Sequence, residues 1–278
     1  MKASYSRISS YWFCPKKYDY RYVQNVPVPV KPELAFGISL HETLEQNFLQ
    51  KRDTRRDLPP DQACALFEKI FDKNFAPVPE EFLRGPSDRH YLRSLGQHFI
   101  RQFLDERAPG LQPLQRGVEC SFRFDLPGGH ELTGQFDLLD TSWVLHDFKT
   151  SSKPYDPRKA DPTQLILYAW ACEQMFGRPP ESLCFDVFIK GDGEEGPAGL
   201  QAPVVFKTPS PGDLSTVAAR LASMIDQLVE VQTRQWFPRA FDPRRCHWCE
   251  HQPRCQREWD LEGQPLPLRQ KPGTLASG

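Results

Sequence analysis

Alternating apolar and polar residues mark the first strand of a predicted sheet. From residue 117 to 126 every second residue is apolar, which is typical of a strand with one buried face. Two shorter strands follow over residues 133–139 and 144–149 and are joined by a tight turn. Gly134 lies inside the first of them, where glycine indicates a bulge or a close approach of another group to the backbone.

Apolar residues at helical spacing predict helices on both sides of these strands. Three precede the strands, at about 38–52, 59–75 and 87–107, and one follows from Pro162 to about 176, with Asp161 as its N-cap. Two further strands at 182–190 and 202–208 and a helix from Pro211 to about 234 complete this part of the chain. Residues 1–24 are expected to form a short helix and a second segment that begins at Pro15.

Composition gives the chain no overall signature of nucleic-acid binding. Its 35 Lys and Arg residues against 36 Asp and Glu residues leave a net charge of −1. A basic groove remains compatible with this value, because the electric field depends on where the charges lie. No run of 18 apolar residues is present, so no membrane span is expected. The first residues lack the apolar core of a signal peptide, and the expected compartment is the cytoplasm.

The two short strands carry the residues of a candidate metal site. Because side chains alternate along a strand, Asp147 and Lys149 share a face, and Asp137 on the preceding strand is able to meet them. Two carboxylates can hold Mg²⁺ or Mn²⁺, and a neighbouring lysine can orient or help to deprotonate a metal-bound water. These residues suit phosphodiester hydrolysis. A surface hairpin with a salt bridge is the other interpretation of the same pattern.

Four side chains outside the hairpin are further candidates. His41 lies on the inward face of its predicted helix, where a single histidine is more often a core residue than a ligand. Gln164 and Tyr168 stand four residues apart on one helix face and could hydrogen-bond a phosphate or the lysine. Glu119 lies on the polar face of the strand before the hairpin, either as a ligand of a second metal ion or as a surface charge.

Eight cysteines in a chain without a secretion signal favour metal ligation or buried thiols over disulfides. Cys246, Cys249 and Cys255 are close in sequence, and three thiolates need a fourth ligand to complete a metal or iron–sulfur site. His247, His251 or a distant cysteine could supply it, and spacing alone does not separate zinc from iron and sulfur. Residues 1–24 mix basic and aromatic side chains, which suits either contact with a nucleic-acid strand or a partly buried pair of helices.

In their order these motifs resemble the RecB-type nucleases of the PD-(D/E)XK superfamily, the branch that includes AddB and the CRISPR-associated exonucleases with an iron–sulfur cluster. The resemblance extends from Ser9 to Cys255. Its six pieces are Y-x-x-C-P at 11–15, G-x-x-x-H at 37–41, G-x-x-D at 134–137, D-x-K-T at 147–150, Q-x-x-x-Y at 164–168 and C-x2-C-x5-C at 246–255. Asp147 stands where many relatives have Glu, which the superfamily pattern permits.

The resemblance implies an α/β fold of the restriction-endonuclease type, in which a mixed central sheet is flanked by helices. It implies one nuclease domain over residues 1–260 and a disordered, proline-rich tail over 261–278. The implied ligands of Mg²⁺ or Mn²⁺ are His41, Asp137, Asp147 and the backbone carbonyl of Phe148. The implied role of Lys149 is to position or activate the water, and that of Gln164 and Tyr168 is to support Lys149 and the scissile phosphate. Cys14 would join Cys246, Cys249 and Cys255 around a [4Fe–4S] cluster that staples the two chain ends together, with zinc as the alternative.

The expected function is therefore a metal-dependent deoxyribonuclease, an exonuclease on single strands or DNA ends, in repair, recombination or defence. The alternative is a non-catalytic iron–sulfur adaptor that binds DNA within a nuclease or helicase complex. The intact set of Asp137, Asp147 and Lys149 favours the enzyme. Besides DNA, the expected partner is a helicase or a CRISPR or repair protein. The direction of digestion, endonucleolytic action, a preference for RNA, the pathway and the oligomeric state do not follow from the sequence.

Overall fold

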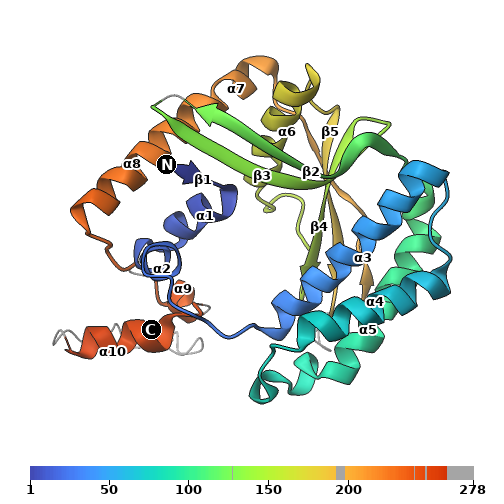
Figure 1. Cartoon of the computed structure of the whole chain (residues 1–278), viewed down its shortest axis with the longest axis horizontal. Coiled ribbons are helices and arrows are strands. Elements are labelled where there is room, and N and C mark those ends of the chain that lie inside the picture. The colour runs from blue at the N-terminus through green and yellow to red at the C-terminus, as the bar shows by residue number, and fades with distance from the viewer. Residues whose placement is uncertain (127, 192–197, 241, 248, 262–278) are drawn as a thin grey trace, which may run out of the picture. The chain divides into compact units, whose positions relative to one another are not determined.

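The computed structural model describes residues 1–278 except 127, 192–197, 241, 248 and 262–278 (Figure 1). The chain forms two compact units: a central unit, Pro29–Leu221, and a terminal unit that combines Met1–Val28 with the described residues from Ala222 onward. The single domain expected over residues 1–260 stays a prediction. From residue 262 the tail that was predicted to be disordered lies outside the described residues. None of the described helices has the length and apolarity needed to cross a membrane.

A mixed sheet forms the middle of the central unit. Its strands are β2 (Pro113–Leu126), β3 (His130–Asp140), β4 (Val144–Ser151), β5 (Ser182–Ile189), β6 (Gly199–Leu200) and β7 (Val204–Lys207). β2, β3 and β4 pair in antiparallel order, whereas β4 and β5 are parallel. β5 also pairs antiparallel with β6 and β7. The parallel crossover from β4 to β5 contains helix α6 (Thr163–Phe176), and this arrangement confirms the expected mixed sheet flanked by helices.

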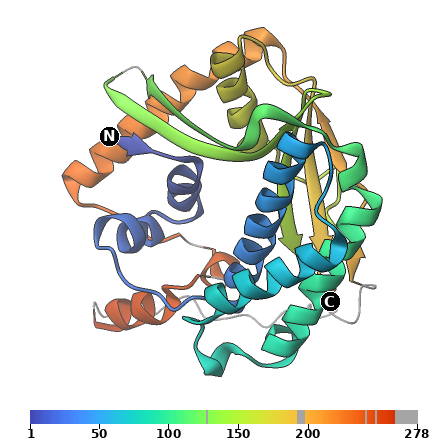
Figure 2. The same ribbon diagram turned by 45° about the vertical axis from the view of Figure 1, so that its right-hand side comes forward.

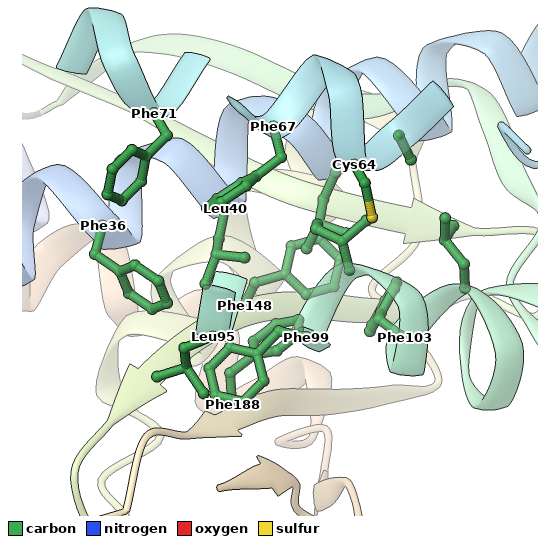
Figure 3. Close-up of a cluster of buried hydrophobic side chains, with 14 of the residues drawn as sticks. Phe36, Leu40, Cys64, Phe67, Phe71, Leu95, Phe99, Phe103, Phe148 and Phe188 are labelled. Carbon is green, nitrogen blue, oxygen red and sulfur yellow. The ribbon is translucent and has the colours of Figure 1, made fainter. Parts of the chain in front are cut away.

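Helices α3 (Pro32–Thr54), α4 (Pro60–Phe75) and α5 (Arg89–Glu106) pack together beside the sheet (Figures 1 and 2). A cluster of phenylalanine side chains joins them to β4 (Figure 3). The ring of Phe148 stacks parallel to that of Phe48 with centroids 5.9 Å apart, and it meets the ring of Phe103 edge-on at 5.6 Å. These contacts fix β4, the strand that carries Asp147 and Lys149, against α3 and α5.

One local prediction is corrected by the structure. The helix expected from residue 211 to 234 is two helices, α7 (Pro211–Ser215) and α8 (Val217–Arg234). At the break the hydroxyls of Ser215 and Thr216 donate to the carbonyls of Gly212 and Asp213, at 2.7 and 2.8 Å. Such side-chain bonds compete with the hydrogen bonds of a continuous helix.

For Gly134 the structure excludes the bulge and leaves the close approach, because the β2–β3 register runs without a shift from Val118 to Leu126. The irregularity lies earlier, between Pro113 and Val118. The close neighbour of Gly134 is an aromatic ring, since a Cβ built on Gly134 would lie 2.3 Å from Cζ of Phe122. The glycine therefore makes room for a side chain of the adjacent strand.

The remaining helices are short or belong to the terminal unit. The central unit contains the 3-10 helices η2 (Glu80–Phe82), η3 (Gly85–Ser87) and η4 (Ala108–Gly110). The terminal unit contains β1 (Lys2–Ala3), α1 (Tyr5–Phe13), α2 (Pro15–Tyr18), the π-helix η1 (Asp19–Val23), α8 from Ala222 onward, α9 (Pro243–His247) and α10 (Gln252–Leu261).

Candidate active site

The candidate site begins where the β3–β4 ladder ends. The ladder pairs Leu139 with Leu145 and Leu138 with His146. Beyond the last pair, a side chain of β3 bonds the backbone of β4: Oδ2 of Asp137 accepts a hydrogen bond of 2.7 Å from the backbone N–H of Phe148. The carboxylate of Asp137 is thus held beside β4, as the alternation of the two strands predicted.

Asp147 is a buried carboxyl group in this site, with only 2% of the residue exposed. Burial and the nearby Asp137 carboxylate raise the pKa of Asp147 to about 6. The ammonium of Lys149 opposes this effect from a distance of 2.5 Å to Oδ2. Because burial and like charge outweigh the ion pair, the ionised form of Asp147 is less favourable in the folded protein than in the unfolded chain.

Lys149 is held by helix α6 as well as by Asp147. Its Nζ donates to Oε1 of Gln164 at 2.9 Å, and Nε2 of Gln164 donates to the hydroxyl of Tyr168 at 2.8 Å. Burial alone would lower the pKa of Lys149, but the Asp147 carboxylate reverses the effect and the pKa is raised. Lys149 is therefore an ammonium group oriented by a chain of two hydrogen bonds.

His41 faces the carboxylates from helix α3. Its Nδ1 lies 3.5 Å from Oδ1 of Asp137, and its side chain is 33% exposed. Burial would lower the pKa of His41, but the charges of Asp137 and Asp147 outweigh burial and raise it to about 9. The structure thus places this histidine beside the acidic pair, and not inside the apolar core.

Glu119 comes from β2 and reaches the same place. One ligand atom each from His41, Glu119 and Asp137 lie within 4.8 Å of one another. The residue is partly buried and has a φ of 43°. Burial and the Asp137 carboxylate raise the pKa of Glu119 to about 8. The sequence left its role open between metal ligand and surface charge, and the structure places its carboxylate with the candidate ligands.

Comparison with known proteins identifies the family of this fold. Residues 2–256 match the sequence profile of the PD-(D/E)XK nuclease superfamily. The chain belongs to this superfamily. A structure from Eubacterium rectale named "Putative exonuclease" has a similar fold, with a TM-score of 0.52 and 10% identity, over 98% of this chain and 90% of that one. At this identity the likeness concerns the fold alone.

No curated protein matches the chain in sequence. Membership of the superfamily makes the chain a hydrolytic nuclease by family, of a kind that usually uses Mg²⁺ or Mn²⁺. The RecB-like subtype, the exonuclease mode and the iron–sulfur cluster stay predictions, as do the roles of the individual site residues.

A buried ionic cluster that sequence reasoning missed lies behind the candidate site, on the other face of β4. Nδ1 of His146 lies 2.7 Å from Oδ2 of Asp186, and Nε of Arg107 donates to Oδ1 of Asp186 at 2.6 Å. Burial would lower the pKa of His146, but hydrogen bonds to Asp140 and Asp186 raise it well above its ordinary value. Arg107 and Asp186 are 79 residues apart in the chain, so no local spacing in the sequence predicts that they meet.

The cysteines of the predicted cluster meet in the terminal unit of the nuclease. One cavity is lined by Cys14, Cys246, Cys249 and Cys255. The backbone N–H of Ala240 donates to Sγ of Cys14 at 3.4 Å. Burial raises the pKa of Cys249 to about 11, and Cys14 adds to the rise. Four thiols around one cavity are a donor set that suits a tetrahedral or cubane centre.

The histidines that were alternatives for the fourth ligand are not among the described residues that line this cavity. His251 is 2% exposed, and its ring packs against that of Tyr20 with centroids 5.3 Å apart. Burial is the main reason that the pKa of His251 is lowered, so its imidazole is neutral near pH 7. Cys14 therefore lies with the three C-terminal cysteines around the cavity, and its role as fourth ligand stays a prediction.

Proposed function

We propose that the protein is a divalent-cation-dependent deoxyribonuclease of the RecB type that acts on single strands or ends of DNA. The observation that carries the proposal is the convergence of Asp137, Asp147 and Lys149 at the end of the β3–β4 ladder, with His41 beside them. A salt-bridged surface hairpin does not account for this arrangement, because Asp147 is buried and its pKa is raised.

The residues present fit a divalent cation. His41, Asp137, Asp147 and the carbonyl of Phe148 would hold it, an oxygen-rich set with one imidazole that suits Mg²⁺ and, more strongly, Mn²⁺. A bound cation would polarise the scissile phosphate and lower the pKa of a coordinated water. Burial and the Asp137 carboxylate raise the pKa of Asp147, and the two carboxylates together raise that of His41 although burial opposes the rise.

Lys149 would serve as a cation and not as a proton acceptor, because its pKa is raised. Its ammonium can donate hydrogen bonds to the attacking water and to a phosphate oxygen, where negative charge develops in the transition state. Gln164 holds Nζ in position, and Tyr168 holds Gln164. The two α6 residues would therefore act on the reaction through the orientation of Lys149.

In the terminal unit the four cysteines around one cavity support a [4Fe–4S] cluster, with zinc as the alternative. Cys14 and the three C-terminal cysteines lie more than 200 residues apart in the chain, so a shared cluster would close a long loop and stabilise the folded state. Absorbance near 400 nm with equal iron and sulfide content in anaerobically purified protein would support the cluster. Stoichiometric zinc without iron would overturn it.

The decisive test is cleavage of end-labelled single-stranded and double-stranded DNA with Mg²⁺ or Mn²⁺. Short products released from an end, with circular DNA left intact, would establish an exonuclease. Asp147→Asn should abolish cleavage, whereas Asp125→Asn, an exposed carboxylate on β2, should leave it unchanged. A matched RNA substrate tests the preference for DNA.

The alternative of an adaptor makes the opposite prediction in this assay. DNA binding without cleavage under all metal conditions would favour the adaptor, whose partner would be a helicase or another repair or CRISPR protein. Cleavage by Asp147→Asn at the wild-type rate would show that a different site acts.

A further inference from the structure

We propose that Glu119 is a further ligand of the divalent-cation centre, in addition to His41, Asp137 and Asp147. The inference rests on the proposed function, because it adds a residue to that same centre. It assigns a chemical role to a carboxylate that the sequence motifs do not include.

The β2–β3 register places Glu119 at the site. Its neighbours Val118 and Cys120 pair with Leu138 and Phe136, so Glu119 lies opposite Asp137 across the two strands. Side chains at opposite positions of an antiparallel pair lie on the same face of the sheet. A carboxylate oxygen of Glu119, a ring nitrogen of His41 and a carboxylate oxygen of Asp137 consequently lie within 4.8 Å of one another.

The backbone at Glu119 is held in this conformation. Its φ of 43° lies in the left-handed region, which is uncommon for residues other than glycine. The side-chain amide of Gln135 donates to the carbonyl oxygen of Glu119 at 3.0 Å. The carboxylate is thus directed by fixed backbone geometry, which matters for a ligand because coordination distances are narrow.

The Glu119 carboxylate is available to a cation. Within the described part of the chain it makes no ion pair with a lysine or arginine, in contrast to Asp147, which pairs with Lys149. It lines a cleft of about 380 Å³ together with Gly37, His41, Glu45 and Thr150. This cleft gives hydrated ions a route to the side chain from solvent.

A direct measurement of Mn²⁺ binding in the absence of DNA tests the inference without relying on catalysis. Titrations monitored by electron paramagnetic resonance would compare the wild type with Glu119→Gln, which keeps the side-chain shape. Asp125→Asn is the matched control, because Asp125 is an exposed carboxylate on the same strand. We expect Glu119→Gln to weaken Mn²⁺ binding at least tenfold or to remove one of two bound ions, and Asp125→Asn to change the affinity less than twofold.

Glu119→Gly is a second variant, because glycine adopts the φ of 43° without strain while the carboxylate is removed. It should lose the same Mn²⁺ affinity. Wild-type affinity and stoichiometry in a folded Glu119→Gln or Glu119→Gly protein would overturn the inference.

The variant Asp137→Asn shows whether a negative result concerns Glu119 alone or the proposed metal centre as a whole. If Asp137→Asn loses Mn²⁺ binding while Glu119→Gln retains it, the centre exists and only the added ligand is wrong. If Asp137→Asn also binds Mn²⁺ like the wild type, the proposed centre itself is wrong, and the role of Glu119 falls with it.

Discussion

Replacing the buried carboxylate of Asp147 by an amide should stabilise the metal-free protein while it abolishes cleavage. The pKa of Asp147 is raised from 3.8 to about 6, through burial first and the Asp137 charge second. Since each pKa unit corresponds to about 1.36 kcal/mol, the ionised carboxylate is about 3 kcal/mol less favourable in the folded than in the unfolded chain. This value already includes the attraction to Lys149. The neutral amide of Asp147→Asn avoids the penalty.

The raised pKa of Asp147 also determines how the difference in stability between the two proteins changes with pH. A carboxyl group with a raised pKa binds its proton more tightly in the folded state, so the wild type loses stability as the pH rises from about 4 to about 6. Asp147→Asn does not share this loss. The two proteins should therefore be equally stable below pH 4, and the variant should be more stable by up to about 3 kcal/mol above pH 6.

Thermal unfolding in EDTA at pH 8 checks the prediction. A gain of this size raises the melting temperature by several degrees, at about 2–4 °C per kcal/mol for a domain of this length. Added Mn²⁺ should narrow the difference, because a ligand at 100 times its Kd stabilises the wild type by about 2.7 kcal/mol, close to the advantage of the variant, and the variant binds it more weakly. Asp125→Asn, the exposed control, should match the wild type throughout. A lower melting temperature for Asp147→Asn in EDTA would refute the reasoning.

Three further predictions concern other parts of the molecule. Burial would lower the pKa of His41, but the neighbouring carboxylates raise it to about 9, so Mn²⁺ must displace a proton from His41 as well as from Glu119, whose pKa is about 8. Calorimetric affinity should therefore rise with pH between pH 7 and 9 and level off above. A flat profile would exclude His41 as a ligand. Cys14→Ser should lose iron and sulfide, measured per chain, while His251→Leu should retain both because its ring lies outside the cysteine cavity; the reverse result would make the histidine a ligand. Gly134→Ala should lower the melting temperature by overpacking that costs about 1–3 kcal/mol, since its Cβ would lie 2.3 Å from an aromatic carbon, whereas Gly110→Ala meets nothing within 4 Å and should not.

The candidate site was largely predictable because its residues obey local geometry. Alternation along two adjacent strands is sufficient to bring Asp137 and Asp147 together, and i,i+4 spacing is sufficient to link Gln164 with Tyr168. The helix and strand ranges followed in the same way from apolar periodicity, with small differences at their ends. One longer error, the helix expected over 211–234, arose because side-chain hydroxyls at the break hydrogen-bond the backbone.

Contacts between segments that are distant in the chain could not be predicted from strand alternation or helical spacing. Glu119 reaches the site through a strand register that the sequence does not specify, and its neighbour His41 is 78 positions earlier in the chain. The cluster of Arg107, His146 and Asp186 likewise joins the end of a helix to two strands. Long-range pairing of this kind depends on the packed structure, and a single sequence contains no pattern that reveals it.

Strand β4 carries candidate site residues on one face and buried structural residues on the other. On one face His146 enters the buried ionic cluster and Phe148 enters the phenylalanine core, while the other face presents Asp147 and Lys149 to the site. A carboxylate that is unfavourable by about 3 kcal/mol without metal tends to push its strand toward looser arrangements. The packing of the opposite face resists that movement and holds Asp147 and Lys149 in place. The packing of one face thus offsets the cost of the buried carboxylate on the other face, which is the trade-off expected of functional residues.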